Sequence, residues 1–517
     1  MLKKKSSYQI LFAAFLPFFV LVEIYRGLVG PKISIGRFAL EEVLVILYAA
    51  ILFLSGCVFA WKENRKKIVF FALGYAILFL VYTLIHSWHI MHFNTAVFSA
   101  AQPDFFVECY YLFRVFAMPA AVLFAAAMLR VPLKWFLRGA EIAVFLTSIC
   151  IIISSLFGFS YICYANGRHV VEGGFLEGLT VRDPAKIARY TAKGPFLIGN
   201  VMGAFLFGLT PFCAWDFWKR KKWTVFAVLF CDGLASVMMG TKVPTIGFFI
   251  AVFAVSILYL IRERREKKLR PQWKAIAALL ALFAVLLPLY FLSPGFRYQK
   301  VRLDALEEDL IRDDLLEKAI HKTKTDPAPA QDGLSEEDRR LSKYLYAHYT
   351  DHFINGDHLE IYPFAEDPEF WREVIERDPA LNHSYRTFKL EMASRIRERN
   401  DSPLDYVLGM GYTSNIPYAE RDFADQFNLF GAVGIVILLL PVGAAFLWGV
   451  KDFLPAFFTK KEYLFTGVFL IGVGSLVSTG VSAGHVLSGT GIINTYLLYL
   501  LSGMILSRMI CGGENAE

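Results

Sequence analysis

Long apolar runs separated by short polar loops make up most of the sequence. A helix needs roughly 20 apolar residues to cross the hydrocarbon core of a bilayer, and twelve runs approach that length. The runs are 8–23, 38–61, 68–90, 106–129, 137–157, 195–218, 224–239, 244–261, 275–292, 427–449, 463–480 and 487–506. We therefore expect an all-α polytopic membrane protein with about twelve transmembrane helices.

The loops between these runs give the expected orientation. Basic clusters lie at 3–5, 62–67, 130–138, 219–222, 262–270 and 451–461, and at Arg508. All of them fall on the same side of the membrane if every run spans, and shifting the count by one helix breaks this pattern. Because basic residues favour cytoplasmic loops, we expect both termini to be cytoplasmic.

One polar segment, 293–426, is too long to be a structureless loop. Residues 293–425 hold 18 Lys and Arg against 28 Asp and Glu, while the rest of the chain holds 35 and 18. Helical spacing at 369–376 and 383–399 predicts a mostly helical extracytoplasmic insertion, with one apolar stripe made by Tyr385, Phe388, Met392 and Ile396. The expected parts are helices 1–9 in 1–292, the insertion in 293–426, and helices 10–12 with a cytoplasmic tail in 427–517.

Composition excludes several classes of function. Charged residues make up 19% of the chain, against about 25% in soluble domains, and no basic stripe lies on a soluble domain. Nucleic acid is therefore not an expected partner. The seven cysteines are scattered, without a CxxC or Cys/His cluster, so we expect no metal, no cofactor and no disulfide framework.

Among the charged residues within the predicted helices are Glu108, Arg114, Glu141 and Asp232. Charged groups inside a bilayer are costly and are functional candidates by default. The simpler interpretation is that they pair with other helices and hold the bundle together, and we expect this for most of them.

Two other places contain residues that could bind a substrate or take part in catalysis. Gly240 and Pro244 interrupt the seventh and eighth helices beside Lys242, and a lysine at a helix N-terminus can bind an anion. A tight hairpin with a snorkelling lysine is the alternative. Glu420 and Asp422 lie just before the tenth helix, where a lipid-linked substrate would present its head group, although they could equally be solvated loop charges.

The order of four short motifs resembles that of the O-antigen ligase and polysaccharide polymerase superfamily, over Arg189 to Gly434. The motifs are the segment from Arg189 through Gly194 and Pro195 to Asn200, then Gly240-Thr241-Lys242, then Arg386 followed by Leu408-Gly409-Met410-Gly411, and last Glu420 to Gly434. Two positions depart from the family pattern. Lys242 replaces an arginine, and Glu420 stands where many ligases have a histidine.

The resemblance implies a glycosyltransferase of the bacterial cytoplasmic (inner) membrane that uses a polyprenyl-diphosphate-linked glycan, together with the lipid bilayer and other polysaccharide assembly proteins. By this resemblance Lys242, Arg386 and Arg297 bind the diphosphate without a metal, and Arg386 also serves catalysis. Glu420 or Asp422 deprotonates the acceptor hydroxyl.

The two departures favour a polysaccharide polymerase. The alternatives are a ligase that transfers glycan to a lipid or protein acceptor, a transporter or flippase for a lipid-linked substrate, and a sensor or scaffold. A polymerase makes a long product ladder, a ligase makes a single transfer, and a transporter needs a cavity that opens alternately to both sides.

Overall fold

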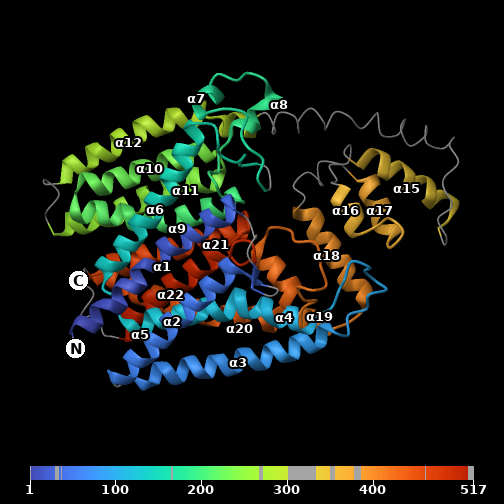
Figure 1. Ribbon diagram of the computed structural model, residues 1–517, viewed down its shortest axis with the longest axis horizontal. Helices are drawn as coiled ribbons and strands as arrows, with labels where there is room; N and C mark the ends of the chain where they lie inside the picture. Colours follow the sequence, from blue (N-terminus) through green and yellow to red (C-terminus); the bar gives the residue numbers. More distant parts are fainter. Residues whose placement is uncertain are drawn as a thin grey trace. The chain divides into compact units, whose positions relative to one another are not determined.

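The computed structural model describes residues 2–29, 34–35, 38–63, 65–164, 167–266, 272–300, 334–349, 356–377, 386–459 and 462–510. Within these residues the fold is nearly all helical (Figure 1). Two short strands, β1 (Ser34–Ile35) and β2 (Phe38–Ala39), pair as an antiparallel hairpin. Both precede α2.

Ten of the described helical segments are long and apolar enough to cross a membrane. They are α1 (Leu2–Leu28), α2 (Leu40–Lys62), α3 (Lys66–Ile90), the continuous α4 (Phe105–Leu112), η1 (Phe113–Ala117) and α5 (Met118–Leu129), α6 (Leu133–Leu156), α9 (Gly199–Arg220), α11 (Lys242–Arg265), α12 (Trp273–Leu292), α20 (Asp422–Thr459) and α21 (Leu464–Ser482). Two further apolar helices, α10 (Trp223–Met239) and α22 (Ile492–Ile510), are shorter. The expected all-α polytopic membrane protein is confirmed.

The chain divides into two compact units, which we describe separately. The membrane unit comprises Met1–Phe79, Phe113–Gln299 and Leu438–Glu517, and the insertion unit comprises Leu80–Leu112 and Lys300–Ile437. The insertion unit therefore combines most of the predicted insertion with the end of α3, with α4 and with the start of α20. The boundaries predicted from the sequence remain a prediction.

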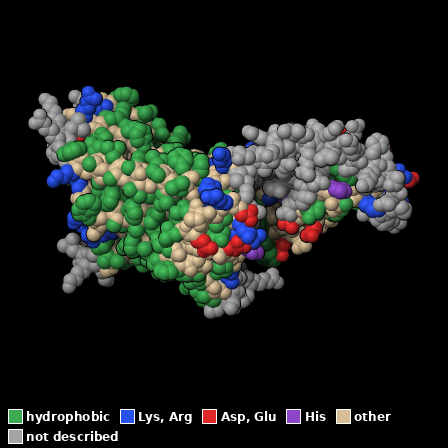
Figure 2. Space-filling view, turned by 90° about the horizontal axis from the view of Figure 1, so that it is seen from above, with side chains coloured by type: hydrophobic (Ala, Val, Ile, Leu, Met, Phe, Trp, Pro, Cys, Tyr) green, Lys and Arg blue, Asp and Glu red, His purple; other side chains and the backbone are tan. Residues whose placement is uncertain are grey.

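Small residues let the helices of the membrane unit approach closely. A Cβ on Gly139 of α6 would lie 2.3 Å from the Ala13 carbonyl oxygen of α1, and one on Gly503 of α22 would lie 2.4 Å from the Leu123 carbonyl oxygen of α5. Close backbone approach at small residues is typical of helices that pack within lipid. Large apolar side chains such as Leu54 and Phe253 are exposed instead, and hydrophobic side chains cover much of the face in Figure 2.

Charged side chains within the apolar helices pair with neighbouring helices, as expected. Arg114 forms an ion pair with Glu42 of α2, and Glu141 forms one with Arg220 of α9. The hydroxyl of Thr210 on α9 donates to Asp232 over 2.8 Å. Such pairs satisfy charges that lipid could not solvate.

The insertion unit has a hydrophobic core of its own. Its residues come from α15 (Glu336–His348), α16 (Gly356–Ile361), α17 (Pro368–Glu376), α18 (Arg386–Asn400) and neighbouring loops, and α19 (Leu404–Leu408) follows α18. Phe388, Met392 and Ile396 are fully buried on one face of α18 and pack with Trp371 of α17. The mostly helical character and this part of the predicted stripe are confirmed, while Tyr385 lies outside the described residues.

Candidate functional site

An accessible ion pair in the insertion unit joins two of the predicted site residues. Arg386 is the first residue of α18, and its Nη2 lies 3.3 Å from Oε2 of Glu420. The side chains are 29% and 38% exposed, respectively. A cation and a carboxylate that are 34 positions apart in the sequence thus meet at a surface that water or a substrate can reach.

The backbone around Glu420 is held in an uncommon conformation. Glu420 has φ +58°, a region that few residues other than glycine adopt and that is often retained at functional sites. The Asp425 carboxylate accepts from the amides of Ala419 and Arg421, both over 2.8 Å. These two bonds close the turn on either side of Glu420 and hold its backbone in this conformation.

Asp422, the second predicted carboxylate, is fully buried at the start of α20. The Tyr418 hydroxyl donates to Asp422 over 2.7 Å. Burial and the neighbouring Asp422 raise the pKa of Tyr418 well above its usual value, so this hydroxyl stays protonated and keeps donating. Of the two carboxylates, Glu420 is therefore the accessible one and Asp422 is held inside the turn.

Glycines allow two backbone segments of the insertion unit to cross next to this turn. The amides of Met410 and Gly411 donate to the carbonyls of Asn428 and Leu429 over 2.9 and 2.8 Å. Gly409 has φ +88°, and a Cβ there would lie 2.3 Å from the Leu429 carbonyl oxygen. The Gly-x-Gly motif thus provides the space in which the loop and the start of α20 pair.

A buried glutamate binds the loop residues that directly follow this crossing. Glu108 of α4 is fully buried, and it accepts from the amides of Tyr412 and Thr413, both over 2.9 Å. The Thr413 hydroxyl donates to it over 3.0 Å. Its fourth partner is Nε2 of His86 on α3, also at 3.0 Å. One carboxylate therefore binds two consecutive backbone amides, a hydroxyl and an imidazole.

The hydrogen-bond partner of Nδ1 shows that this ring nitrogen of His86 carries a hydrogen. Nδ1 of His86 lies 2.8 Å from the Leu408 carbonyl oxygen, which can only accept, so Nδ1 carries a hydrogen. One helical turn further on, His89 binds the buried Asp405 over 2.9 Å. Two histidines of α3 thereby bind Leu408 and Asp405 of α19, the short helix that ends directly before Gly409.

In the membrane unit, Lys242 begins α11 directly after a sharp turn. Helix α10 ends at Met239, Gly240 has φ +69°, and the exposed Lys242 follows. The Gly240 carbonyl accepts from the Tyr164 hydroxyl over 3.0 Å and from Nε2 of Gln299 over 2.7 Å. The predicted helix break is confirmed, and its geometry presents a lysine at a helix N-terminus.

Lys193 was not among the predicted site residues, although it lies in the first quoted motif. It is fully buried, and burial lowers its pKa to about 8. The amide of Ala192 next to it donates to the Met238 carbonyl over 3.3 Å. The motif segment therefore packs against the end of α10, just before the turn that leads to Lys242.

Arg297 has its hydrogen bonds within the protein. Its guanidinium donates to the carbonyls of Leu179, over 3.1 Å, and of Val181. A third, longer contact of 3.5 Å joins it to the Gly178 carbonyl. These bonds hold the segment after α7 (Phe175–Gly178) in place. The predicted binding of diphosphate by Arg297 remains a prediction.

A model of O-antigen ligase like membrane proteins matches residues 6–510, nearly the whole chain. The chain belongs to this family. No curated protein matches it individually. Family membership assigns the chain to membrane glycan transfer and confirms the resemblance drawn from the four motifs.

The structure explains the glycines of three of the four motifs. Gly240, Gly409 and Gly431 all have positive φ, and a Cβ on any of them would lie within 2.4 Å of a neighbouring backbone atom. The pairing of His86 with Glu108 was missed because the two residues come from different helices. The available signal was His86 and His89 at i and i+3 near the end of an apolar run, which puts both on one helix face.

Proposed function

We propose that this protein is a polysaccharide polymerase. It would transfer glycan from a polyprenyl diphosphate to an acceptor sugar hydroxyl at the outer face of the bacterial cytoplasmic membrane. Family membership supports the glycan transfer. The single observation that carries the assignment of residues is the accessible pair of Arg386 with Glu420 on a strained turn.

In this mechanism Glu420 takes the proton of the acceptor hydroxyl. The hydroxyl oxygen then attacks the anomeric carbon, the bond from that carbon to the phosphate oxygen breaks, and polyprenyl diphosphate leaves with the electron pair. Negative charge grows on the leaving diphosphate. Fixed cations aimed at developing charge are typically worth a few kcal/mol each, and Lys242 and Arg386 are the proposed cations.

The pairing of Arg386 with Glu420 suggests how the base is released. While Arg386 binds the carboxylate, one oxygen of Glu420 is occupied. The oxygens of an arriving diphosphate would compete for the same guanidinium, because arginine binds phosphate in a bidentate manner. Binding of the donor would then free Glu420 to accept the acceptor's proton.

The test is chain elongation on a fluorescent lipid-linked repeat by the purified protein. We expect Lys242→Ala, Arg386→Ala and Glu420→Gln each to fold and to lose about 100-fold or more in rate, the range seen for single stabilising or proton-transferring groups. Arg340→Ala and Glu398→Gln remove exposed charges on α15 and α18 and are the matched controls. Wild-type rates in all three site variants would refute the assignment.

Product size separates the proposal from its alternatives. A ladder of lengths supports a polymerase, and a single transfer to a lipid or protein acceptor supports a ligase. Movement of the intact lipid-linked substrate across a vesicle membrane, without a new glycosidic bond, would instead support a transporter or flippase.

A further inference from the structure

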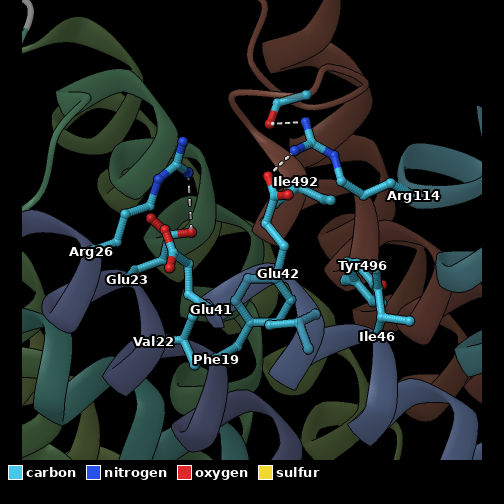
Figure 3. A pocket seen from close by; sticks show the side chains of 12 residues that line it. Phe19, Val22, Glu23, Arg26, Glu41, Glu42, Ile46, Arg114, Ile492 and Tyr496 are labelled. Atoms are coloured by element: carbon cyan, nitrogen blue, oxygen red, sulfur yellow. Dashed lines mark hydrogen bonds and ion pairs between the residues drawn. The ribbon is translucent and has the colours of Figure 1, made fainter. Parts of the chain in front are cut away.

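A small cavity in the membrane unit is lined by an unusual number of charged groups. It has a volume of about 30 Å³ and lies between α1, α2, η1 and the start of α22 (Figure 3). Three glutamates and two arginines line it: Glu23, Glu41, Glu42, Arg26 and Arg114. The site is independent of the groups proposed above for glycan transfer.

Ion pairing accounts for only two of the three carboxylates. Nη1 of Arg26 lies 3.8 Å from Oε1 of Glu23, and Arg114 pairs with Glu42. Nη2 of Arg114 also donates to the Gly489 carbonyl over 3.3 Å. Neither ion pair includes Glu41, so the cavity has one carboxylate more than it has guanidinium groups.

Two polar atoms in this lining lack a hydrogen-bond partner among the described residues. Glu41 is 5% exposed, and its buried Oε2 accepts no hydrogen bond. The buried Nε of Arg114 donates none. In Figure 3 the carboxyl groups of Glu41 and Glu23 lie next to each other at the same space. Because a buried polar group without a hydrogen bond is costly, these atoms offer one acceptor and one donor to a ligand that has both a donor and an acceptor.

The backbone conformation around Arg114 also indicates a binding site. Residues Phe113–Ala117 form a π-helical turn between α4 and α5. Such turns are rare and occur frequently at functional sites. The wider turn changes the direction of Arg114 relative to a continuous α-helix, and the side chain bonds to both α2 and the segment before α22.

We propose that this cavity binds the head group of phosphatidylethanolamine. A primary ammonium is about the size of a water molecule, fits the cavity and donates to Oε2 of Glu41. The adjoining phosphate accepts from Arg114 and Arg26. Apolar side chains such as Phe19, Val22 and Val45 form the rest of the lining. The position of the cavity at the end of α1 and the start of α2 suits the depth of a lipid head group.

This chemistry discriminates among common lipids. The trimethylammonium group of phosphatidylcholine has no N–H donor and is larger than the cavity. Phosphatidylglycerol has no cation to meet the extra carboxylate. N-methylation of phosphatidylethanolamine removes its donors one at a time without changing the rest of the molecule, so the methylated series tests the role of Glu41 in the unaltered protein.

The experiment measures lipid retention by native mass spectrometry of the purified full-length chain after exchange into equimolar lipid mixtures. We expect about tenfold preference for phosphatidylethanolamine over phosphatidylcholine and phosphatidylglycerol, which is about 1.4 kcal/mol, and a stepwise fall with N-methylation. Glu41→Gln should abolish the preference. Glu63→Gln, a carboxylate at the opposite end of α2, should retain it.

Two results would overturn the proposal. One is equal retention of all three lipids and of the methylated series by the wild-type protein, which would mean that the cavity holds ordered water only. The other is an unchanged preference in Glu41→Gln. If that variant does not fold, the methylated series on the wild-type protein still decides the question.

Discussion

Replacing Glu108 by glutamine is the sharpest test of the buried network in the insertion unit. The substitution keeps the shape of the side chain and exchanges one acceptor oxygen for an NH₂ group. In the native structure Oε1 faces the amide of Tyr412, and Oε2 faces the amide of Thr413. Whichever way the new amide turns, its NH₂ group opposes one of these two backbone N–H groups.

The magnitude follows from this geometry. One buried backbone donor loses its acceptor, which costs about 1–3 kcal/mol. The remaining bonds lose the strengthening that a charged acceptor gives, about 1 kcal/mol or more. We therefore expect a local destabilisation of about 2–4 kcal/mol at the Gly409–Thr413 loop, much more than for an average surface substitution.

Hydrogen exchange measured by mass spectrometry on peptides that cover residues 409–416 is the direct assay. A loss of about 3 kcal/mol corresponds to roughly 100-fold faster exchange of the protected amides. Glu398→Gln on the exposed face of α18 is the matched control and should leave this exchange unchanged. Wild-type protection in Glu108→Gln would refute the view that one carboxylate holds this loop.

Three further predictions follow from individual contacts. Gly409→Ala should destabilise the insertion unit by more than about 2 kcal/mol. Its backbone (φ +88°, ψ 171°) lies in a region that is essentially restricted to glycine and costs other residues about 1–3 kcal/mol, and the new Cβ would lie 2.3 Å from the Leu429 carbonyl oxygen. Thermal unfolding measures the change, and an unchanged midpoint would contradict it. Burial, followed by the nearby Lys389, lowers the pKa of His358 to about 4. As pH falls from 6.5 to 4, the unfolded chain therefore binds a proton before the folded chain does, and about 3 kcal/mol of the free energy of unfolding is lost in that window. His358→Phe should lose less of its free energy of unfolding over this pH range. The control His92→Phe should lose as much as the wild type. Arg297→Lys should increase proteolysis near residue 179 if Arg297 holds that segment, whereas a raised KM for donor lipid with unchanged proteolysis would favour the predicted diphosphate role.

The apolar pattern predicted the helices well because lipid leaves the backbone few alternatives. Within hydrocarbon, every N–H and C=O group must bond internally, so a long apolar run becomes a helix. The pattern was less informative about irregularities inside a run. The run at 106–129 gave no sign of the π turn at Phe113–Ala117, and α20 continues to Thr459, beyond the predicted end at 449.

The candidate site was predictable to the extent that local chain geometry defines it. Gly240 and Pro244 predicted the break before Lys242, since these residue types interrupt helices wherever they occur. The four bonds of Glu108 depend on segments about 300 positions away, and no local pattern contains that information. Arg386 and Glu420 were selected as separate motif residues, and only the fold brings them together.

The pairing of Arg386 with Glu420 gives a physical meaning to the glutamate at position 420, where the resemblance drawn from the sequence places a histidine in many ligases. A histidine there could not form the same pair with an arginine unless it were neutral, whereas a glutamate binds the guanidinium directly. In the proposed mechanism, Glu420 would therefore be occupied by Arg386 until the diphosphate of the donor binds the guanidinium. If this exchange operates, Arg386→Lys should impair catalysis although it keeps the positive charge, because lysine cannot bind phosphate in a bidentate manner. We expect kcat at saturating acceptor to fall and the rate to depend less strongly on donor concentration. A rise in donor KM with an unchanged kcat would show that Arg386 binds the donor without controlling the base.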